Sequence, residues 1–163
     1  MPDKSTIKKA QKDKEEGKSA GTQAGEFVHD EIEKIRKGKH GARSAKQAIA
    51  IGLSEARRAG VKLGVPKKGS AELKKKAQRD IEKAKSHEPV SQTRSRARIK
   101  ALKKEPTDTV SHDALSKQAS AAAKKRSASD RSLAAKKASE TKGPKERSEA
   151  AKKAARTRAA NKN

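Results

Sequence analysis

The fold is decided by residues 22–63, which read TQAGEFVHDEIEKIRKGKHGARSAKQAIAIGLSEARRAGVKL. The first half places apolar side chains at the three- and four-residue spacing of one helical stripe. These side chains are Ala24, Phe27, Val28, Ile32 and Ile35. Acidic residues precede basic ones, an order that suits the helix dipole, and Gly38 is a natural end. The pattern predicts an amphipathic helix over 22–37, capped by Thr22.

A second amphipathic pattern follows a short basic loop. Its apolar face consists of Ala45, Ala48, Ile49, Gly52, Leu53 and Ala56. This spacing, with Ser44 as a candidate N-cap, predicts a helix over 45–59. Ile51 is expected to lie off the apolar face. Joined by a short loop, the two helices would form an αα-hairpin. The small residues Gly52 and Ala56 would permit their close approach.

The rest of the chain reads as helical segments with decreasing apolar content. Residues 71–85 carry a narrow stripe of leucine, isoleucine and alanine, which could complete a three-helix unit or stay in solvent. The last part is rich in alanine and lysine, with an imperfect repeat that includes RSLAAKK at 131–137 and RSEAAKK at 147–153. Such a segment frays alone and gains helicity when its charges are neutralised.

The sequence therefore predicts four segments. They are a charged N-terminal segment at 1–20, a helical unit at 21–85 (hairpin 22–60 plus helix 71–85), a linker with a short basic helix at 86–110, and a Lys/Ala-rich low-complexity basic tail at 111–163. The expected fold class is all-α: a small helical hairpin or three-helix unit with a long basic, partly disordered helical tail. A sizeable core is excluded, because hydrophobic residues make up 30% of the chain and many of them are alanine.

The sequence holds no recognisable constellation for catalysis or metal binding. It has no cysteine and 4 histidines, which lie far apart and match no zinc-ligand spacing. No serine lies in a GxSxG frame, and no glycine-rich phosphate loop is present. We therefore expect a protein that is not an enzyme and binds no cofactor or metal.

Positive charge is the dominant signal. The chain has 44 lysines and arginines against 20 acids, a formal net charge of +24, and solubility asks only ~2–8 of a small domain. Such cations bind nucleic acid by neutralising phosphates and releasing counterions. Phe27 is the one aromatic residue and belongs to the apolar stripe, which disfavours base stacking. Duplex DNA is therefore the favoured partner, and structured RNA is an alternative.

Two sets of basic residues are the predicted nucleic-acid contacts. In the helical unit they are Lys39, Arg43, Lys46, Arg57, Arg58 and Lys62. In the tail, which would provide most of the affinity, they are Lys124, Lys125, Lys136, Lys137, Lys152, Lys153, Arg156 and Arg158. A helix-turn-helix that reads a groove is a less favoured use of the hairpin, because its loop exceeds the usual length of about 3–4 residues.

Residues 22–63 resemble an uncharacterised bacterial family recorded as a domain of unknown function. The most distinctive stretches are KQAIAI at 46–51 and SEAR at 54–57, and Gly52 stands where relatives often have alanine. The tail at 111–163 is similar to the Lys/Ala-rich tails of linker histones and to bacterial histone-like proteins. The first resemblance implies no activity, and the second implies DNA binding.

The leading hypothesis is a histone-like, nucleoid-associated protein of the cytoplasm that binds DNA phosphates with little sequence specificity. Two alternatives stay open: a structural or partner-docking protein, which could be phage-derived, and an RNA-binding protein. A protein partner or self-association would use the hairpin at 22–60. No membrane association is expected, because no apolar run approaches the ~18 residues of a membrane span.

Overall fold

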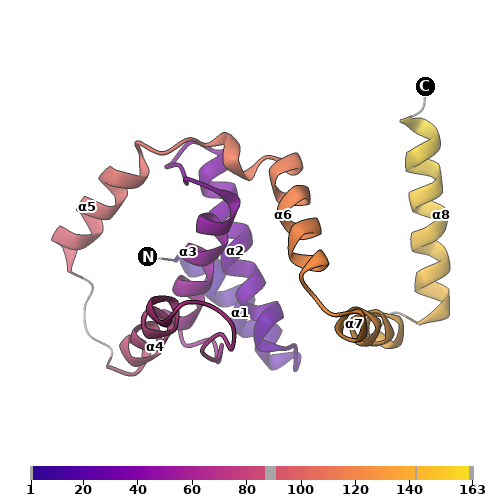
Figure 1. The fold of residues 1–163 in the computed structure, drawn as a ribbon, viewed down its shortest axis with the longest axis horizontal. Coiled ribbons are helices and arrows are strands. Elements are labelled where there is room, and N and C mark those ends of the chain that lie inside the picture. Colours follow the sequence, from indigo (N-terminus) through magenta and orange to yellow (C-terminus); the bar gives the residue numbers. More distant parts are fainter. Residues whose placement is uncertain (1, 87–90, 142, 162–163) are drawn as a thin grey trace. The chain divides into compact units, whose positions relative to one another are not determined.

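The computed structural model describes residues 2–86, 91–141 and 143–161. Over these residues the chain forms eight α-helices, one short 3-10 helix and no strand (Figure 1), which confirms the all-α class. The chain divides into two compact units, Met1–Gln118 and Ala119–Asn163. Every buried side chain of the described residues lies in the first unit.

The predicted hairpin is present as α2 (Ala20–Arg36) and α3 (Ala45–Arg58), which pack on each other (Figure 1). Their backbones approach closely at Gly52, where an added Cβ atom would lie 2.7 Å from Val28 Cα and 2.9 Å from Val28 N. Ala56, one turn further along α3, is fully buried. The close approach predicted for these small residues is therefore confirmed.

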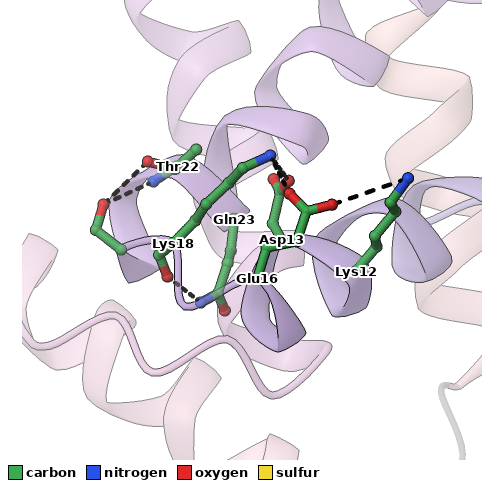
Figure 2. A network of polar contacts seen from close by, with 7 residues as sticks. Lys12, Asp13, Glu16, Lys18, Thr22 and Gln23 are labelled. Atoms are coloured by element: carbon green, nitrogen blue, oxygen red, sulfur yellow. Dashed lines mark hydrogen bonds and ion pairs between the residues drawn. The ribbon is translucent and has the colours of Figure 1, made fainter. Parts of the chain in front are cut away.

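Helix α1 (Lys4–Glu15) lies against α2, and a polar network holds the turn between them (Figure 2). Lys18 Nζ is 2.7 Å from Oδ1 of the buried Asp13 and 2.8 Å from Glu16 Oε2. Hydrogen bonds to these two carboxylates raise the pKa of Lys18 above its usual value. The Lys18 carbonyl also accepts a hydrogen bond of 2.8 Å from Gln23 Nε2. Both the side chain and the backbone of Lys18 therefore tie α1 to α2.

Helix α2 begins earlier than expected because its N-cap is Ser19. Ser19 Oγ accepts a hydrogen bond of 3.3 Å from the N–H of Thr22, and the two hydroxyl oxygens are 3.0 Å apart (Figure 2). The predicted cap at Thr22 is therefore wrong, although Thr22 takes part in the cap as the donor. Both residue types are favourable caps, and the turn held by Lys18 decides which of them starts the helix.

Helix α3 is also covered by α4 (Ala71–Ser86) and by the 3-10 helix η1 (Asp108–Val110). Of the two options left open for the third helix, packing on the hairpin is therefore the one observed. Ile51, expected off the apolar face of α3, is buried with 7% of its surface exposed. It lies one turn before Ser54, whose hydroxyl bonds to Asp80 of α4. The expectation for Ile51 is wrong, because α3 has α4 and η1 as neighbours in addition to α2 and buries more than one stripe.

Residues 102–110, part of the predicted linker, dock on the loop between α2 and α3. They begin at Leu102, the last residue of α5 (Gln92–Leu102). The N–H groups of Gly41 and Ala42 each donate a hydrogen bond of 2.9 Å to a carbonyl of this segment. Val110 at its end is fully buried. The segment thus closes one end of the hairpin and supplies part of the core.

The core of the first unit is small and consists largely of alanine. Its largest fully buried side chains are Phe27, Ile35 and Val110. Phe27 packs against alanines of α1, α2 and α3, while Ile35 and Val110 pack against alanines of the interhelical loop and of α3. The apolar area that these residues remove from water is limited, so the unit depends on close helix packing.

The second unit contains the end of α6 (His112–Lys124), together with α7 (Ala128–Thr141) and α8 (Pro144–Ala160). No described residue of this unit is buried. Its helices therefore rest on the helix propensity of alanine, lysine, arginine and glutamate more than on packing. The helical character predicted for the tail is present, and disorder in part of the tail stays a prediction.

Replacing Gly52 by alanine tests the close approach of α2 and α3. The added methyl group would meet the backbone of Val28, so we expect Gly52→Ala to lower the free energy of unfolding by about 1–3 kcal/mol. Gly25→Ala is the matched control, because Gly25 lies within α2 and an added Cβ has no neighbouring contact within 4 Å. That variant should gain about 0.5–1 kcal/mol from helix propensity. Urea unfolding followed by circular dichroism measures both, and a Gly52→Ala protein as stable as the parent would contradict this packing.

Candidate functional site

Two acidic side chains of α2, Asp30 and Glu33, form ion pairs with basic residues of the same helix and of its C-cap. Lys34 Nζ is 2.7 Å from Asp30 Oδ2. Arg36 and Lys37 lie 3.4 and 3.8 Å from the two carboxylate oxygens of Glu33. The positive charge of α2 is thus largely neutralised within the helix, and free cations must come from other elements.

The predicted contacts of the helical unit fall into two groups. The first group, around the start of α3, comprises Lys39, Arg43 and Lys46, which are exposed. The second group, at and after the end of α3, comprises Arg57, Arg58 and Lys62. Lys46 and Arg57 are separated by about 16 Å along the helix axis. Arg43 also lies 3.5 Å from Glu105, but such an exposed pair is weak. These residues are therefore spread along the length of α3 and are not gathered at one point.

The two arginines at the end of α3 differ in accessibility. Arg58 Nε donates a hydrogen bond of 2.7 Å to Oδ1 of the buried Asp80, and the Arg58 side chain is 38% exposed. Arg57 is half-buried, with Nη1 3.5 Å from the Leu53 carbonyl oxygen. Its Nε is buried without a hydrogen-bond partner among the described residues. Arg58 is thus the better placed of the two to meet a ligand from solvent.

A basic groove runs along α4 beside the end of α3, and most of its cations were not among the predicted contacts. It has a volume of about 520 Å³. Its lining residues are Arg58, Glu72, Lys75, Lys76, Arg79, Asp80 and Lys83. Lys75, Arg79 and Lys83 recur every four residues and therefore share one face of α4. This spacing within KKKAQRDIEK (74–83) is the sequence signal that could have identified them.

The predicted contacts of the tail are all exposed. They are Lys124 and Lys125 at the end of α6, Lys136 and Lys137 within α7, and Lys152, Lys153, Arg156 and Arg158 within α8. No ion pair involves them in the part of the tail that the structure describes. Adjacent lysines point about 100° apart around a helix, so each Lys-Lys pair covers a broad sector. The tail therefore presents positive charge around its helices and no single binding face.

A buried acid lies between α2 and the loop that follows it. Glu31 is 2% exposed. Its Oε2 is 3.6 Å from His40 Nε2, and its Oε1 has no hydrogen-bond partner among the described residues. Burial raises the pKa of Glu31, and Glu55 raises it further, whereas His40, Lys34 and Arg98 lower it. The imidazole of His40 faces this acid, which makes it a poor contact for phosphate.

Besides these charged surfaces, the described residues form a more apolar groove of about 240 Å³ between α3 and α4, whose lining includes Ile49, Leu53 and Leu73. No cluster of histidine, cysteine and acidic side chains among them could hold a metal ion. None of their helices combines the length and the apolar character needed to cross a bilayer.

Residues 14–69 match the model of a family of unknown function (DUF6496). The match begins near the end of α1, includes α2 and α3, and stops before α4. It supports the predicted resemblance of residues 22–63 to an uncharacterised family. The hairpin is thus similar to a domain without an assigned function. Comparison with curated proteins and with solved structures gave no match.

The buried Glu31 makes a prediction about stability and pH. Because burial raises its pKa above the usual 4.5, the folded state holds the Glu31 proton more tightly than the unfolded state does. Stability should therefore fall as the pH rises from about 4.5 through the raised pKa of the folded state. Glu31→Gln removes this titration, so its unfolding free energy should fall less over that range. The measurement is urea unfolding at a series of pH values, with the exposed Glu15→Gln as the control that keeps the parent profile. A Glu31→Gln protein with the parent profile would show that burial of this acid has no such effect.

Proposed function

We propose that the protein binds duplex DNA through its phosphates, with little sequence specificity and without catalysing a reaction. The observation that carries this proposal is the state of the tail cations. They are exposed on α6, α7 and α8, and they form no ion pairs in the described part of the tail. A segment that buries no side chain has charge as its main means of binding a partner.

Exposed lysines on helices suit the charge of a nucleic-acid duplex. Duplex DNA carries one negative charge per ~1.7 Å of its axis, and each phosphate that a cation neutralises releases condensed counterions. Neutralisation by phosphate also removes repulsion between lysines along each helix, so binding would stabilise the tail helices. A broad cationic surface needs no particular orientation toward the duplex, which favours coating over a single binding site.

The burial of Phe27 supports a duplex over a single strand. Proteins that bind single strands stack bases on aromatic side chains. Phe27 is the one aromatic residue of the chain, and it is 1% exposed in the core. The remaining contacts are with the sugar–phosphate backbone, which carries no base sequence directly. Low sequence specificity follows.

The packing of α3 argues against groove reading by the hairpin. A recognition helix must leave one side open to the major groove, whereas α3 is packed by α2, α4 and η1 and keeps only a narrow exposed stripe that includes Lys46 and Ala50. Gln47, one of the polar residues at its start, accepts a hydrogen bond of 2.6 Å from the Arg43 N–H and so takes part in the local turn. Phosphate binding without base readout is the better use of this surface.

The proposal extends to a histone-like, nucleoid-associated role in a bacterial cell. Its support is the Lys/Ala-rich composition of residues 111–163 and their similarity to linker-histone tails. The match of residues 14–69 to a family of unknown function adds no partner. RNA binding and docking of a protein partner remain the alternatives against which the role is tested.

Removing charge from the tail tests the proposed function. The variant replaces Lys124, Lys125, Lys136, Lys137, Lys152 and Lys153 by glutamine in the full chain. The logarithm of the duplex affinity should fall with the logarithm of salt concentration, and the slope should decrease by about one for each phosphate that the variant no longer neutralises. Replacing the same lysines by arginine keeps the charge and should keep the slope, which makes it the matched control.

The outcome that contradicts the proposal is a salt slope of the glutamine variant equal to that of the parent. Titration of a structured RNA under the same conditions distinguishes RNA binding from DNA binding, because an RNA-binding protein should bind the RNA more tightly than duplex DNA. Purification from nuclease-treated cells tests the docking of a protein partner, because that alternative predicts one dominant protein that stays bound after the treatment.

A further inference from the structure

The groove along α4 combines free cations with one buried acid. Its lining includes five basic side chains and the two acids Glu72 and Asp80. Asp80 is 2% exposed, and both of its carboxylate oxygens accept hydrogen bonds from α3. Asp80 is engaged with Arg58, so the exposed Glu72 is the one remaining acid of the lining against four further cations. The groove is therefore positively charged toward solvent.

Asp80 holds the guanidinium of Arg58 in place. Arg58 Nε donates a hydrogen bond of 2.7 Å to Asp80 Oδ1, and Ser54 Oγ donates one of 2.6 Å to Asp80 Oδ2. Ser54 and Arg58 are four residues apart on α3, so one face of the helix presents both donors to Asp80. A guanidinium bound through Nε still has two amino groups to donate, and its planar geometry suits the oxygens of a phosphate.

The cations of α4 differ from those of α2 in having no acidic neighbours in contact. Lys75, Arg79 and Lys83 are exposed, and no ion pair involves them within the described chain. They extend over about 12 Å along the helix axis, a length of duplex axis that carries roughly seven phosphate charges. Their spacing therefore matches an extended anion better than a single small one.

The charged lining of the groove disfavours an apolar ligand. Small-molecule sites of roughly 300–1,000 Å³ are lined mainly by hydrophobic and aromatic side chains. All the lining residues of this groove are charged. A polyanion such as the phosphate backbone is the chemical class that fits.

We propose that this groove is a phosphate-binding site of the folded unit, separate from the tail, at which α4 and Arg58 contact the backbone of duplex DNA. Asp80 is its positioning residue, because it orients Arg58 without touching the ligand. The proposal rests on the proposed function, since it takes duplex DNA as the polyanion. The groove would hold phosphate in a fixed geometry, whereas the tail would bind it through many exposed cations without a fixed geometry.

A comparison of two charge-matched variants of the full chain tests the site. The groove variant is Lys75→Gln, Arg79→Gln and Lys83→Gln. The control variant is Lys8→Gln, Lys9→Gln and Lys14→Gln, which removes the same charge from exposed positions of α1. The salt slope of duplex binding should decrease by about three in the groove variant and by less than one in the control. Equal decreases in the two variants would overturn the site.

The role of Asp80 is tested by variants for which total charge and geometry predict opposite results. Asp80→Asn raises the net charge by one, so charge alone predicts tighter binding, whereas loss of the Arg58 orientation predicts several-fold weaker binding. Circular dichroism and thermal unfolding show whether this variant is folded. Arg58→Lys keeps the charge of a half-exposed side chain, but an ammonium is a point charge without the planar fork. It should weaken binding several-fold in a folded protein even where Asp80→Asn does not fold.

The two proposals fail in different ways. A parent chain that binds no duplex DNA in dilute buffer overturns the proposed function and the groove together. A parent that binds, with Arg58→Lys as tight as the parent and the groove variant no weaker than its α1 control, overturns the groove alone. A groove variant that loses slope for structured RNA but not for duplex DNA also overturns the assignment to DNA.

Discussion

The first unit depends on the distance between the backbones of α2 and α3. Its three largest fully buried side chains are Phe27, Ile35 and Val110, and alanines fill most of the remaining core. An alanine makes enough dispersion contacts only when neighbouring atoms are close, because this attraction falls steeply with separation. Gly52 permits that distance by letting the Val28 backbone lie where a methyl group would otherwise be. A core with so little apolar bulk is stable only as a closely packed one.

The same shortage of apolar side chains explains the use made of acids. Two carboxylates are buried next to cations from other segments: Asp13 by Lys18 at the α1–α2 turn and Asp80 by Arg58 between α3 and α4. A buried carboxylate without a partner is strongly destabilising, so each acid requires its cation in place and thereby specifies how two elements meet. These acids are thus engaged within the fold, while many cations of the described chain, those of α4 and the tail among them, form no ion pair.

The hairpin could be predicted because its signals are local. The apolar stripe around Phe27 and the small residue at Gly52 follow from helical periodicity. The docking of residues 102–110 on the loop could not be predicted, since backbone N–H groups such as that of Gly41 bind carbonyls whatever the side chains are. Ile51 was misplaced for a related reason: a single stripe cannot indicate that α3 has neighbours on more than one side. In the candidate site, composition was enough to indicate the tail lysines. The role of Asp80 could not be predicted, because its hydrogen bonds to Ser54 and Arg58 depend on how α4 packs on α3.

On the proposed function, the two units would meet phosphate at different entropic cost. Immobilising an exposed lysine costs up to about 2 kcal/mol of side-chain conformational entropy. A tail lysine that moves among several phosphates avoids much of this cost, so it contributes affinity without fixing the position of the protein on the duplex. Arg58 has already lost this entropy in the folded state, because Asp80 holds the guanidinium whether or not a ligand is bound. Contacts made by such a pre-ordered side chain can determine where a protein sits on its ligand. With both kinds of contact, the tail would provide affinity and the folded unit would orient the protein on the duplex. Neither affinity nor orientation requires contacts with the bases.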